Sequence, residues 1–252
     1  MSSTHCAENM LLMKSLTSLA LLLVITLSSV QMNAQDTASF FTNADTFFKA
    51  YVKNGLVNYA AVKANPQALD KLLENAASIS VSKSDAATYQ AFWINAYNLA
   101  VIKGIIKKYP VKQPLSIKGF FDKNTYLLGG SKITLNDIEN KKLRAVFPDE
   151  PRFHFVLVCA GLGCPPIINE AYTPAKLKEQ LQRQTTIAVN NPNFIKVSGK
   201  KVQISQIFEW YKEDFIRKGT EIDFLNKYRK EAIPSNAKLS YYPYDWTLND
   251  TK

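Results

Sequence analysis

Three side chains that could carry chemistry lie close together in the sequence. His154, Cys159 and Cys164 fall within eleven residues of one another, in the segment RFHFVLVCAGLGCPP. A cysteine thiolate is a nucleophile, and an imidazole can serve as its general base. Apart from His5 and Cys6, which precede an apolar N-terminal run, the chain has no other histidine or cysteine. Cys–His catalysis in the main part of the chain must therefore use His154.

The spacing of these residues favours Cys164 as the partner of His154. The alternation of residues 152–159 predicts a core strand, on which His154 and Cys159 point to opposite faces. Two glycines between the cysteines permit a tight loop that could return Cys164 towards the histidine. The amides of that loop could also hold an oxyanion. We therefore expect Cys164 as the nucleophile and His154 as the base, with Cys159 as the alternative thiol.

A second interpretation is that Cys159 and Cys164 form a structural disulfide, as cysteines of exported proteins often do. Closing so short a loop would stabilise the fold by only roughly 2 kcal/mol on chain-entropy reasoning, so the bridge would mainly fix the shape of the loop. The usual four-ligand Cys/His zinc site is excluded, because only three such ligands are available. We expect no metal and no cofactor.

Polar residues elsewhere could support the thiol site. Asn95 and Asn98 lie one helical turn apart in an apolar segment, and a buried amide without a partner costs about 1–3 kcal/mol. Each should therefore bind something specific, either a neighbouring loop or, in a functional role, the histidine or a substrate carbonyl. Glu139 and Asp245 are acidic candidates for orienting His154, although the first is also explained as a helix cap and the second as a turn residue. The candidate catalytic set is Cys164, His154, Asn95 and Glu139.

The elements that must position these residues predict an α+β fold. The segment AFWINAYNLAVIKGII is apolar on most sides and predicts a long, buried central helix that begins at residue 84 or 85 and ends before Pro110. Paired glycines at 129 and 130 and a Ser-Gly pair at 198 and 199 predict β-hairpins. Further helices are expected at 42–53, after Pro66, and from residues 136, 173, 205 and 220, followed by a last strand in the tail. Helices separated by hairpins indicate a single α+β domain with a small antiparallel sheet.

The N-terminal segment predicts export. Lys14 precedes an apolar run over residues 16–27, and the small-residue site Met32-Asn33-Ala34 follows. This pattern is typical of a secretory signal rather than of a membrane span of roughly 20 residues. We expect residues 1–34 to be removed and residues 35–252 to form one periplasmic or extracellular domain without a membrane span. We also expect a monomer.

The charge of the chain gives little indication of a partner. The formal net charge is +10, but the basic residues are scattered in doublets rather than gathered in a run. Such a distribution is typical of an ordinary solvated surface, and no basic-aromatic motif indicates nucleic-acid binding. We expect a small or peptide-like substrate and no nucleic acid.

Several motifs occur in an order that is similar to a known family. The segments FWINAYNLAVI, LNDIE followed by LR, RFHFVLVCAGLGCPP and ISQIFEWYKEDF resemble the bacterial and plant family called domain of unknown function 547, over about residues 89–215. The resemblance implies a single globular α+β domain, often exported in bacteria, and supplies no activity. The residues that match the family's signature are Trp93, Asn95, Tyr97, Asn98, Glu139, Arg144, His154, Cys159, Cys164 and Pro165.

The pattern is also loosely similar to papain-like and transglutaminase-like folds. In those folds the nucleophilic cysteine opens the central helix and precedes the histidine, whereas here the central helix has no cysteine and His154 comes first. The sequence thus leaves two functions open. One is an exported thiol-dependent hydrolase or acyltransferase that acts on peptide or envelope amides. The other is a non-catalytic envelope binding module with a structural Cys159–Cys164 disulfide.

Overall fold

The structure, a computed structural model, describes residues 36–251, so the predicted export signal at 1–34 lies outside the described residues. Helices alternate with short strand pairs along the chain, which confirms the predicted α+β class. The N-terminal half is mainly helical and comprises a helix over residues 36–51, β1 (Val52–Lys53), β2 (Leu56–Val57), α2 (Tyr59–Ala64), α3 (Gln67–Ser78), α4 (Ala86–Ile106) and the short η1 (Pro114–Ser116). None of the helices in the described part is long and apolar enough to cross a membrane.

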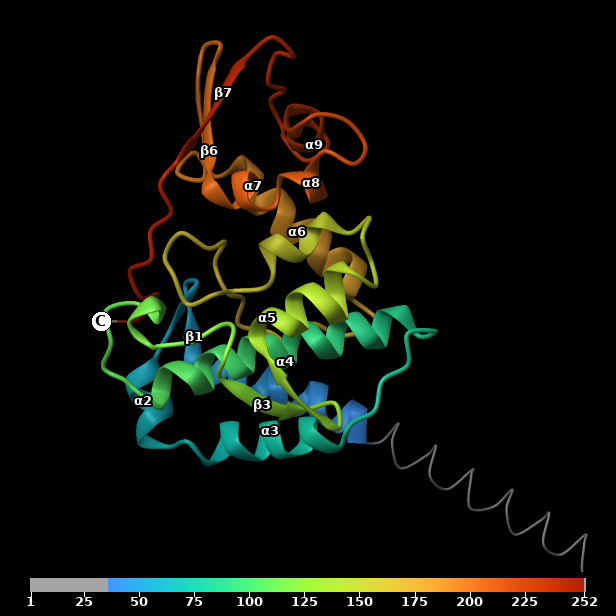
Figure 1. Ribbon diagram of the computed structural model, residues 1–252, viewed down its shortest axis with the longest axis vertical. Coiled ribbons are helices and arrows are strands. Elements are labelled where there is room, and N and C mark those ends of the chain that lie inside the picture. The colour runs from blue at the N-terminus through green and yellow to red at the C-terminus, as the bar shows by residue number, and fades with distance from the viewer. Residues whose placement is uncertain (1–35, 252) are drawn as a thin grey trace, which may run out of the picture.

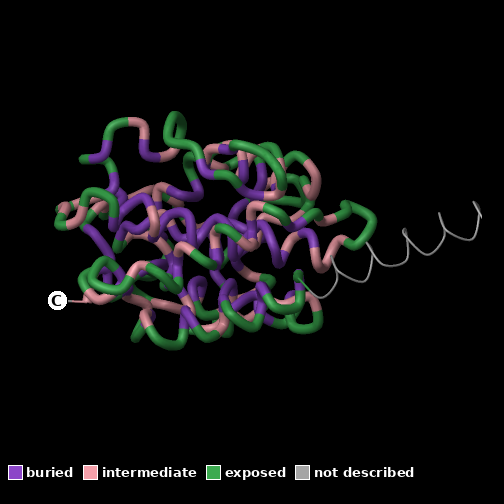
Figure 2. The backbone as a smooth tube through the Cα atoms, turned by 90° about the horizontal axis from the view of Figure 1, so that it is seen from below, coloured by how far each residue is buried: buried purple, intermediate pink, exposed green. Residues whose placement is uncertain are grey.

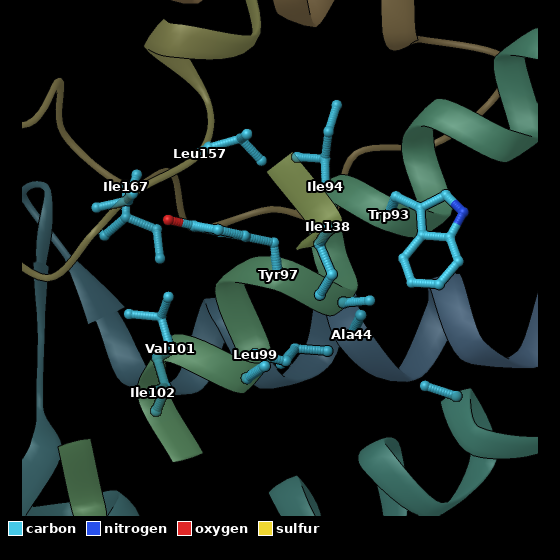
Figure 3. Close-up of a cluster of buried hydrophobic side chains, with 14 of the residues drawn as sticks. Ala44, Trp93, Ile94, Tyr97, Leu99, Val101, Ile102, Ile138, Leu157 and Ile167 are labelled. Carbon is cyan, nitrogen blue, oxygen red and sulfur yellow. The ribbon is translucent and has the colours of Figure 1, made fainter. Parts of the chain in front are cut away.

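Helix α4 is the predicted central helix. The Asp85 side chain caps it by accepting a hydrogen bond from the Thr88 amide. Because the helix is apolar on nearly every side, it packs against neighbours all round. Figure 3 shows its side chains projecting in several directions among residues of other segments, including Ala44, Ile138, Leu157 and Ile167. The predicted burial of its core side chains is confirmed for Trp93, Tyr97, Leu99 and Ile102.

The strands form three small sheets rather than one. Both predicted hairpins are present, β3 (Thr125–Leu128) with β4 (Ser131–Thr134), and β5 (Ile195–Ser198) with β6 (Lys201–Ser205). The first turn places both of its central glycines, Gly129 and Gly130, at positive φ, as a two-residue hairpin turn requires. The predicted last strand is β7 (Lys238–Tyr242), but it pairs parallel to β6, so this sheet is mixed and not antiparallel.

Residues 152–159 are not the strand that their alternation predicted. They begin with a 3-10 helix, η3 (Pro151–Phe155), whose first turn is favoured by Pro151 and capped by the Glu150 carboxylate. All residues from Phe153 to Val158 are buried, so the segment is covered on every side and does not present one face to a sheet. Because this segment is not paired with another strand, a tight local turn forms some of its backbone hydrogen bonds instead.

The helix after the first hairpin also differs from the expectation. Thr134, not Asn136, caps α5 (Leu135–Asp137), because its hydroxyl accepts a hydrogen bond from the Asp137 amide. The chain then continues as a π-helix, η2 (Ile138–Arg144). Glu139 is therefore not a helix cap, and its carboxylate is available for other contacts. π-helices are rare and frequently occur at functional sites.

The C-terminal half begins with α6 (Leu177–Asn190), a few residues later than the predicted Thr173, and continues through β5 and β6 to α7 (Gln206–Trp210), α8 (Lys212–Phe215) and α9 (Glu221–Asn226). The predicted caps of α7 and α9, Ser205 and the Thr220–Asp223 capping box, are confirmed. In Figure 1, α7, α8, α9 and the β6–β7 pair lie in one half of the molecule, and α2, α3 and α4 lie in the other.

Two clusters of buried apolar residues correspond to these halves, and η3 joins them. Phe153 belongs to the cluster around α4, whereas Phe155 belongs to the cluster of the C-terminal half. After β7 the chain returns to the first half, where the C-terminal end lies (Figure 1) and where Asp250 pairs with Val57 of β2. The buried stretches pass through the middle of the molecule, and the exposed ones form its outer loops (Figure 2). The junction between the clusters is therefore enclosed by segments from both halves.

Candidate active site

A cavity of about 290 Å³ lies at this junction, and its lining includes the two predicted thiols and the histidine. Its walls come from α4, from the π-helix, from the segment that follows η3, and from α7 and the C-terminal tail. Sites between packed units are common places for small-molecule binding. The cavity is lined by Tyr97, Phe121, Asn136, Glu139, His154, Leu157, Cys159, Cys164, Ile207, Trp210, Tyr211, Tyr244 and Trp246.

Two asparagines of α4 hold the backbone on either side of the thiol segment. The Asn98 side chain donates to the Val156 carbonyl and accepts from the Val158 amide, both at 2.9 Å. One turn earlier, the Asn95 side chain makes the same pair of bonds to the backbone of Tyr172, at 2.7 and 3.0 Å. Each amide thus replaces the strand partner that these buried backbone groups lack. Both asparagines therefore bind loop backbone, which is one of the two alternatives that the sequence left open. Neither side chain lines the cavity.

The loop between the cysteines is bound to the C-terminal tail. Leu162 and Gly163 donate their amides to the carbonyls of Thr247 and Asp245, each at 2.8 Å. A Cβ at Gly163 would lie 2.8 Å from the tail backbone, so only glycine allows this approach. The amides of Leu162 and Gly163 are already bonded to the tail, so of the three loop amides that were expected to hold an oxyanion these two are not free to do so. Ala160, directly after Cys159, has a φ of +65°, an uncommon conformation that often marks a functional position.

The two cysteines are free thiols in the structure and lie against each other. Their Sγ atoms are 2.6 Å apart. The hydroxyl of Tyr244 lies 2.7 Å from the Cys159 sulfur and 2.8 Å from the Cys164 sulfur, and the Cys159 amide donates to the Cys164 sulfur at 3.1 Å. The disulfide of the alternative interpretation is therefore not formed. Within the described residues, no group of three or more His, Cys, Asp or Glu side chains is arranged to hold a metal ion.

The surroundings make the two thiols unequal. Burial raises the pKa of Cys159, but hydrogen bonds from the Cys164 thiol, the Tyr244 hydroxyl and the Gly161 amide outweigh burial and lower it below the ordinary thiol value. Burial and the neighbouring sulfur of Cys159 raise the pKa of Cys164 well above that value. Cys159 is therefore the thiol of the pair that ionises first, and Cys164 is the one that retains its proton longer. This assignment reverses the preference that the strand alternation gave to Cys164.

His154 is oriented by a carboxylate that the sequence analysis did not consider. Its Nε2 lies 2.8 Å from Oδ2 of Asp214 in α8, and the same oxygen accepts a hydrogen bond from Arg144 Nε at 2.6 Å. Burial raises the pKa of Asp214, but the bonds to His154 and Arg144 hold it well below its usual value. Asp214 therefore stays ionised and can stabilise a protonated imidazole. The expectations that Asn95, Glu139 or Asp245 orients the histidine are wrong.

Tyr211 connects this pair to Glu139. Its ring stacks on His154 with centroids 4.0 Å apart, and the Arg144 guanidinium lies 4.8 Å from the same ring. Burial, and then the charge and a hydrogen bond of Glu139, raise the pKa of Tyr211, which keeps its hydroxyl protonated. The π-helix thus supplies two contacts to one ring, through Glu139 near its start and Arg144 at its end. Glu139 lies in the site but acts on Tyr211 rather than on His154.

The outcome for the predicted site residues is mixed. His154, Cys159, Cys164 and Glu139 all line one cavity, whereas Asn95 holds a loop behind it and Asp245 accepts the Thr247 amide in a turn. The residues that sequence reasoning missed are Asp214, Tyr211 and Tyr244. The first two belong to the motif ISQIFEWYKEDF, so the resemblance contained a signal that was not assigned to the site. Tyr244 lay in a tail that gave no such signal.

One family model matches a range of the chain that includes part of this site. The family model described as "Protein of unknown function, DUF547" matches residues 81–187. The matched range contains both thiols, His154 and Glu139, but it ends before Asp214 and Tyr244. The motifs predicted a range of about 89–215, so the match ends earlier at its C-terminal side than predicted. Neither the curated proteins nor the solved structures contain a match to the chain.

Proposed function

Residues 81–187 belong to the DUF547 family, whose description names no activity. We propose, from the residues of the site, that the cavity is the active site of a thiol-dependent hydrolase or acyltransferase. The nucleophile is Cys159, and His154 with Asp214 carries the proton. The observation on which the proposal rests is the combination of a thiol with a lowered pKa and a carboxylate-bound imidazole in the lining of one cavity. Lowered thiol pKa values and oriented imidazoles are the features that activate cysteine nucleophiles.

The direction of the two pKa shifts favours Cys159 over Cys164 as the nucleophile. The Tyr244 hydroxyl contacts both sulfurs and the Cys159 amide donates to Cys164, but the pKa is lowered for Cys159 and raised for Cys164. A thiolate stabilised by donors is the reactive form of cysteine. Ala160 fixes the backbone directly behind Cys159 at positive φ, which holds the sulfur at the cavity wall. Cys164 then acts as a positioning residue through its S–H group.

The reaction follows the ordinary course of cysteine acyl transfer. The Cys159 thiolate attacks the acyl carbon, a carbon–sulfur bond forms, and the leaving group departs with a proton from the His154 imidazolium. Water or an acceptor amine then gives a proton to the neutral His154 as it attacks the thioester. The acyl product leaves, and the thiolate and imidazolium are restored. Asp214 stabilises the charged imidazole in both steps.

The walls of the cavity support a small or peptide-like substrate with an apolar body. Phe121, Trp210, Tyr244 and Trp246 form a cluster of rings, in which Tyr244 and Trp246 have centroids 4.6 Å apart and Trp210 and Trp246 have centroids 5.9 Å apart. Aromatic walls bury large apolar areas with little loss of side-chain entropy. Peptide or envelope amides with an apolar residue beside the scissile bond fit this description.

We also propose that the protein acts outside the cytoplasm, in the periplasm or the extracellular medium. The support is the pattern of Lys14, the apolar run at 16–27 and the small-residue site at 32–34. Sequencing the N-terminus of protein recovered from the medium or the periplasm tests this proposal. A start near Gln35 supports it, and retention of the apolar run contradicts it.

Acylation of Cys159 is the decisive experiment. Residues 35–252 are mixed with a p-nitrophenyl ester of a peptide-like acyl group, and intact-protein mass spectrometry follows the addition of one acyl group. We expect one group on Cys159, slower addition in the His154→Gln variant, and no addition in Cys159→Ala. The Cys164→Ser variant is the matched control and should still be acylated. A native protein whose thiols stay unmodified would contradict the enzyme and favour the non-catalytic binding module.

A further inference from the structure

The described lining of the cavity contains a carboxylate and no lysine or arginine, in a protein that is basic overall. The chain has a formal net charge of +10, yet no lysine or arginine is among the described residues that line the cavity, and Glu139 is their only carboxylate. Ionisation of Cys159 adds a second negative charge to the same walls, and in the proposed mechanism the His154 imidazolium balances it. A site with this charge repels anionic ligands and attracts cationic ones.

The basic residues nearest in sequence to Glu139 are occupied elsewhere. Lys141 pairs with the carboxylate one turn before it, at 2.8 Å, and Lys142 lies over an indole ring, 5.2 Å from its centroid. Arg144 donates to Asp214 at 2.6 Å. Within the described residues, Glu139 takes part in none of the salt bridges. Glu139 accepts a hydrogen bond from the Tyr211 hydroxyl, and its charge raises the pKa of Arg144, but the carboxylate has further lone pairs in the wall of an aromatic cavity that can accept hydrogen bonds from a cation supplied by a ligand.

We infer that the cavity binds the primary ammonium group of its substrate, with Glu139 accepting hydrogen bonds from the ammonium and the aromatic walls covering the apolar body beside it. The N-terminal residue of a peptide, or an amino-acyl group, has this chemistry. The inference rests on the proposed acyl transfer and names its substrate class. Tyr211, Trp210 and Trp246 add ring faces and edges, which favour an organic cation over a neutral group of the same size.

A bound ammonium group would also assist the nucleophile. The Glu139 charge opposes ionisation of Cys159 and raises its pKa, in the direction opposite to the hydrogen bonds that lower it. A cation beside Glu139 cancels this repulsion, so the thiolate fraction rises when the correct substrate is present. The carboxylate therefore has two uses in the cavity, since it selects the substrate and links its binding to thiol activation.

The test compares three small probes that differ in charge and share a phenyl group: 2-phenylethylamine, 2-phenylethanol and phenylacetate. Their dissociation constants are measured by calorimetry on residues 35–252 at neutral pH. We expect the amine to bind about tenfold more tightly than the alcohol, the effect of one charge-assisted hydrogen bond, and the acid to bind most weakly. Equal affinity for the amine and the alcohol in the native protein would overturn the inference without any variant.

Two isosteric variants locate the effect. Glu139→Gln should bind the amine and the alcohol equally, because it keeps the shape of the side chain and loses the charge. Asp137→Asn, which removes a carboxylate two positions away that already pairs with Lys141, should keep the tenfold preference. A preference that persists in Glu139→Gln would contradict the assignment to Glu139.

Binding and catalysis can be separated with the Cys159→Ala variant. This variant cannot be acylated, but it retains Glu139 and the aromatic walls and should still prefer the amine. Retained preference together with an unreactive native thiol would overturn the acyl-transfer proposal and leave the ammonium site intact. Acylation of Cys159 without any preference for the amine would overturn the ammonium site alone.

Discussion

The Tyr244 hydroxyl lies 2.7 Å from the Cys159 sulfur, although the two residues are separated by 85 positions in the chain. This contact joins the C-terminal tail to the thiol segment of the family-matched region. The tail is held in place by the bonds of Leu162 and Gly163 to its carbonyls. The charge state of the thiol pair therefore depends on a segment that lies outside the matched range.

The first prediction concerns this hydroxyl. Replacing Tyr244 with Phe removes a hydrogen bond to the Cys159 thiolate, so the pKa of Cys159 should rise and iodoacetamide labelling near neutral pH should slow. The labelling rate measured against pH should show its midpoint moved to higher pH. Tyr242→Phe is the matched control, because that hydroxyl lies 3.1 Å from the Phe194 carbonyl. An unchanged profile in Tyr244→Phe would show that the tail does not tune the thiol.

The second prediction concerns oxidation of the thiol pair. A small disulfide such as oxidised glutathione should be attacked by the Cys159 thiolate, which releases one reduced thiol and leaves a mixed disulfide. Cys164 should then displace the second thiol and close the Cys159–Cys164 disulfide, since the sulfurs already touch. Mass spectrometry should find native protein that has lost two hydrogens, and the Cys164→Ser variant should stop at the mixed disulfide. Stable mixed disulfides in the native protein would contradict the contact.

The third prediction concerns pH and Asp214. Its pKa is held well below 3.8, its ordinary value, so its contribution to stability is complete above about pH 5 and is lost as pH falls through 3.8 towards the folded value. Asp214→Asn leaves Arg144 without its carboxylate and should cost roughly 3 kcal/mol at pH 7. Urea unfolding should show this difference from the native protein shrink between pH 5 and pH 3.

Asp137→Asn is the control for this pH series. Its partner Lys141 is largely exposed, so the substitution should change the free energy of unfolding little at any of these pH values. A difference between native protein and Asp214→Asn that stays constant from pH 7 to pH 3 would mean that the ionised carboxylate of Asp214 does not stabilise the fold.

The fourth prediction concerns the amide of Asn95. Replacement by Leu leaves the amide and carbonyl of Tyr172 without partners in a fully buried position, and should cost about 1–3 kcal/mol. Gln90→Leu on the same helix is the control, because that side chain binds only the Ala86 carbonyl one turn before it and should cost less. A thermal midpoint of Asn95→Leu equal to that of the native protein would show that the loop does not need this clamp.

The fifth prediction concerns the role of His154 in proton transfer. His154→Gln should slow both acylation and release of the acyl group, because the imidazole supplies and accepts the proton in the two steps. Stopped-flow measurement of p-nitrophenol release separates a fast first turnover from the slower steady state. Asn136→Ala changes another residue of the cavity lining and should leave both phases in place. Equal rates in native protein and His154→Gln would exclude the imidazole from the reaction.

The helices and hairpins predicted from local features of the sequence were confirmed where neighbouring residues alone decide the structure. The apolar run and the Asp85 cap identified α4, and the glycines at 129 and 130 identified the first hairpin. Helix periodicity, capping and turn conformation depend on residues a few positions apart, so the sequence displays them directly. The same reasoning found that Cys159, Cys164 and His154 belong to one site, because they are close in the chain.

Only the tertiary structure decided which partner each of these groups has. Residues 152–159 have the composition of a strand, but none of the strands in the described residues pairs with them, and Asn98 of α4 binds the Val156 carbonyl and the Val158 amide instead. Asp214 reaches His154 across 60 positions, and Tyr244 reaches Cys159 across 85. Contacts between distant segments depend on how the two buried clusters pack, and no spacing in the sequence encodes that packing. The sequence thus determined which residues could do chemistry, and the packing of the two halves determined which thiol is the more acidic.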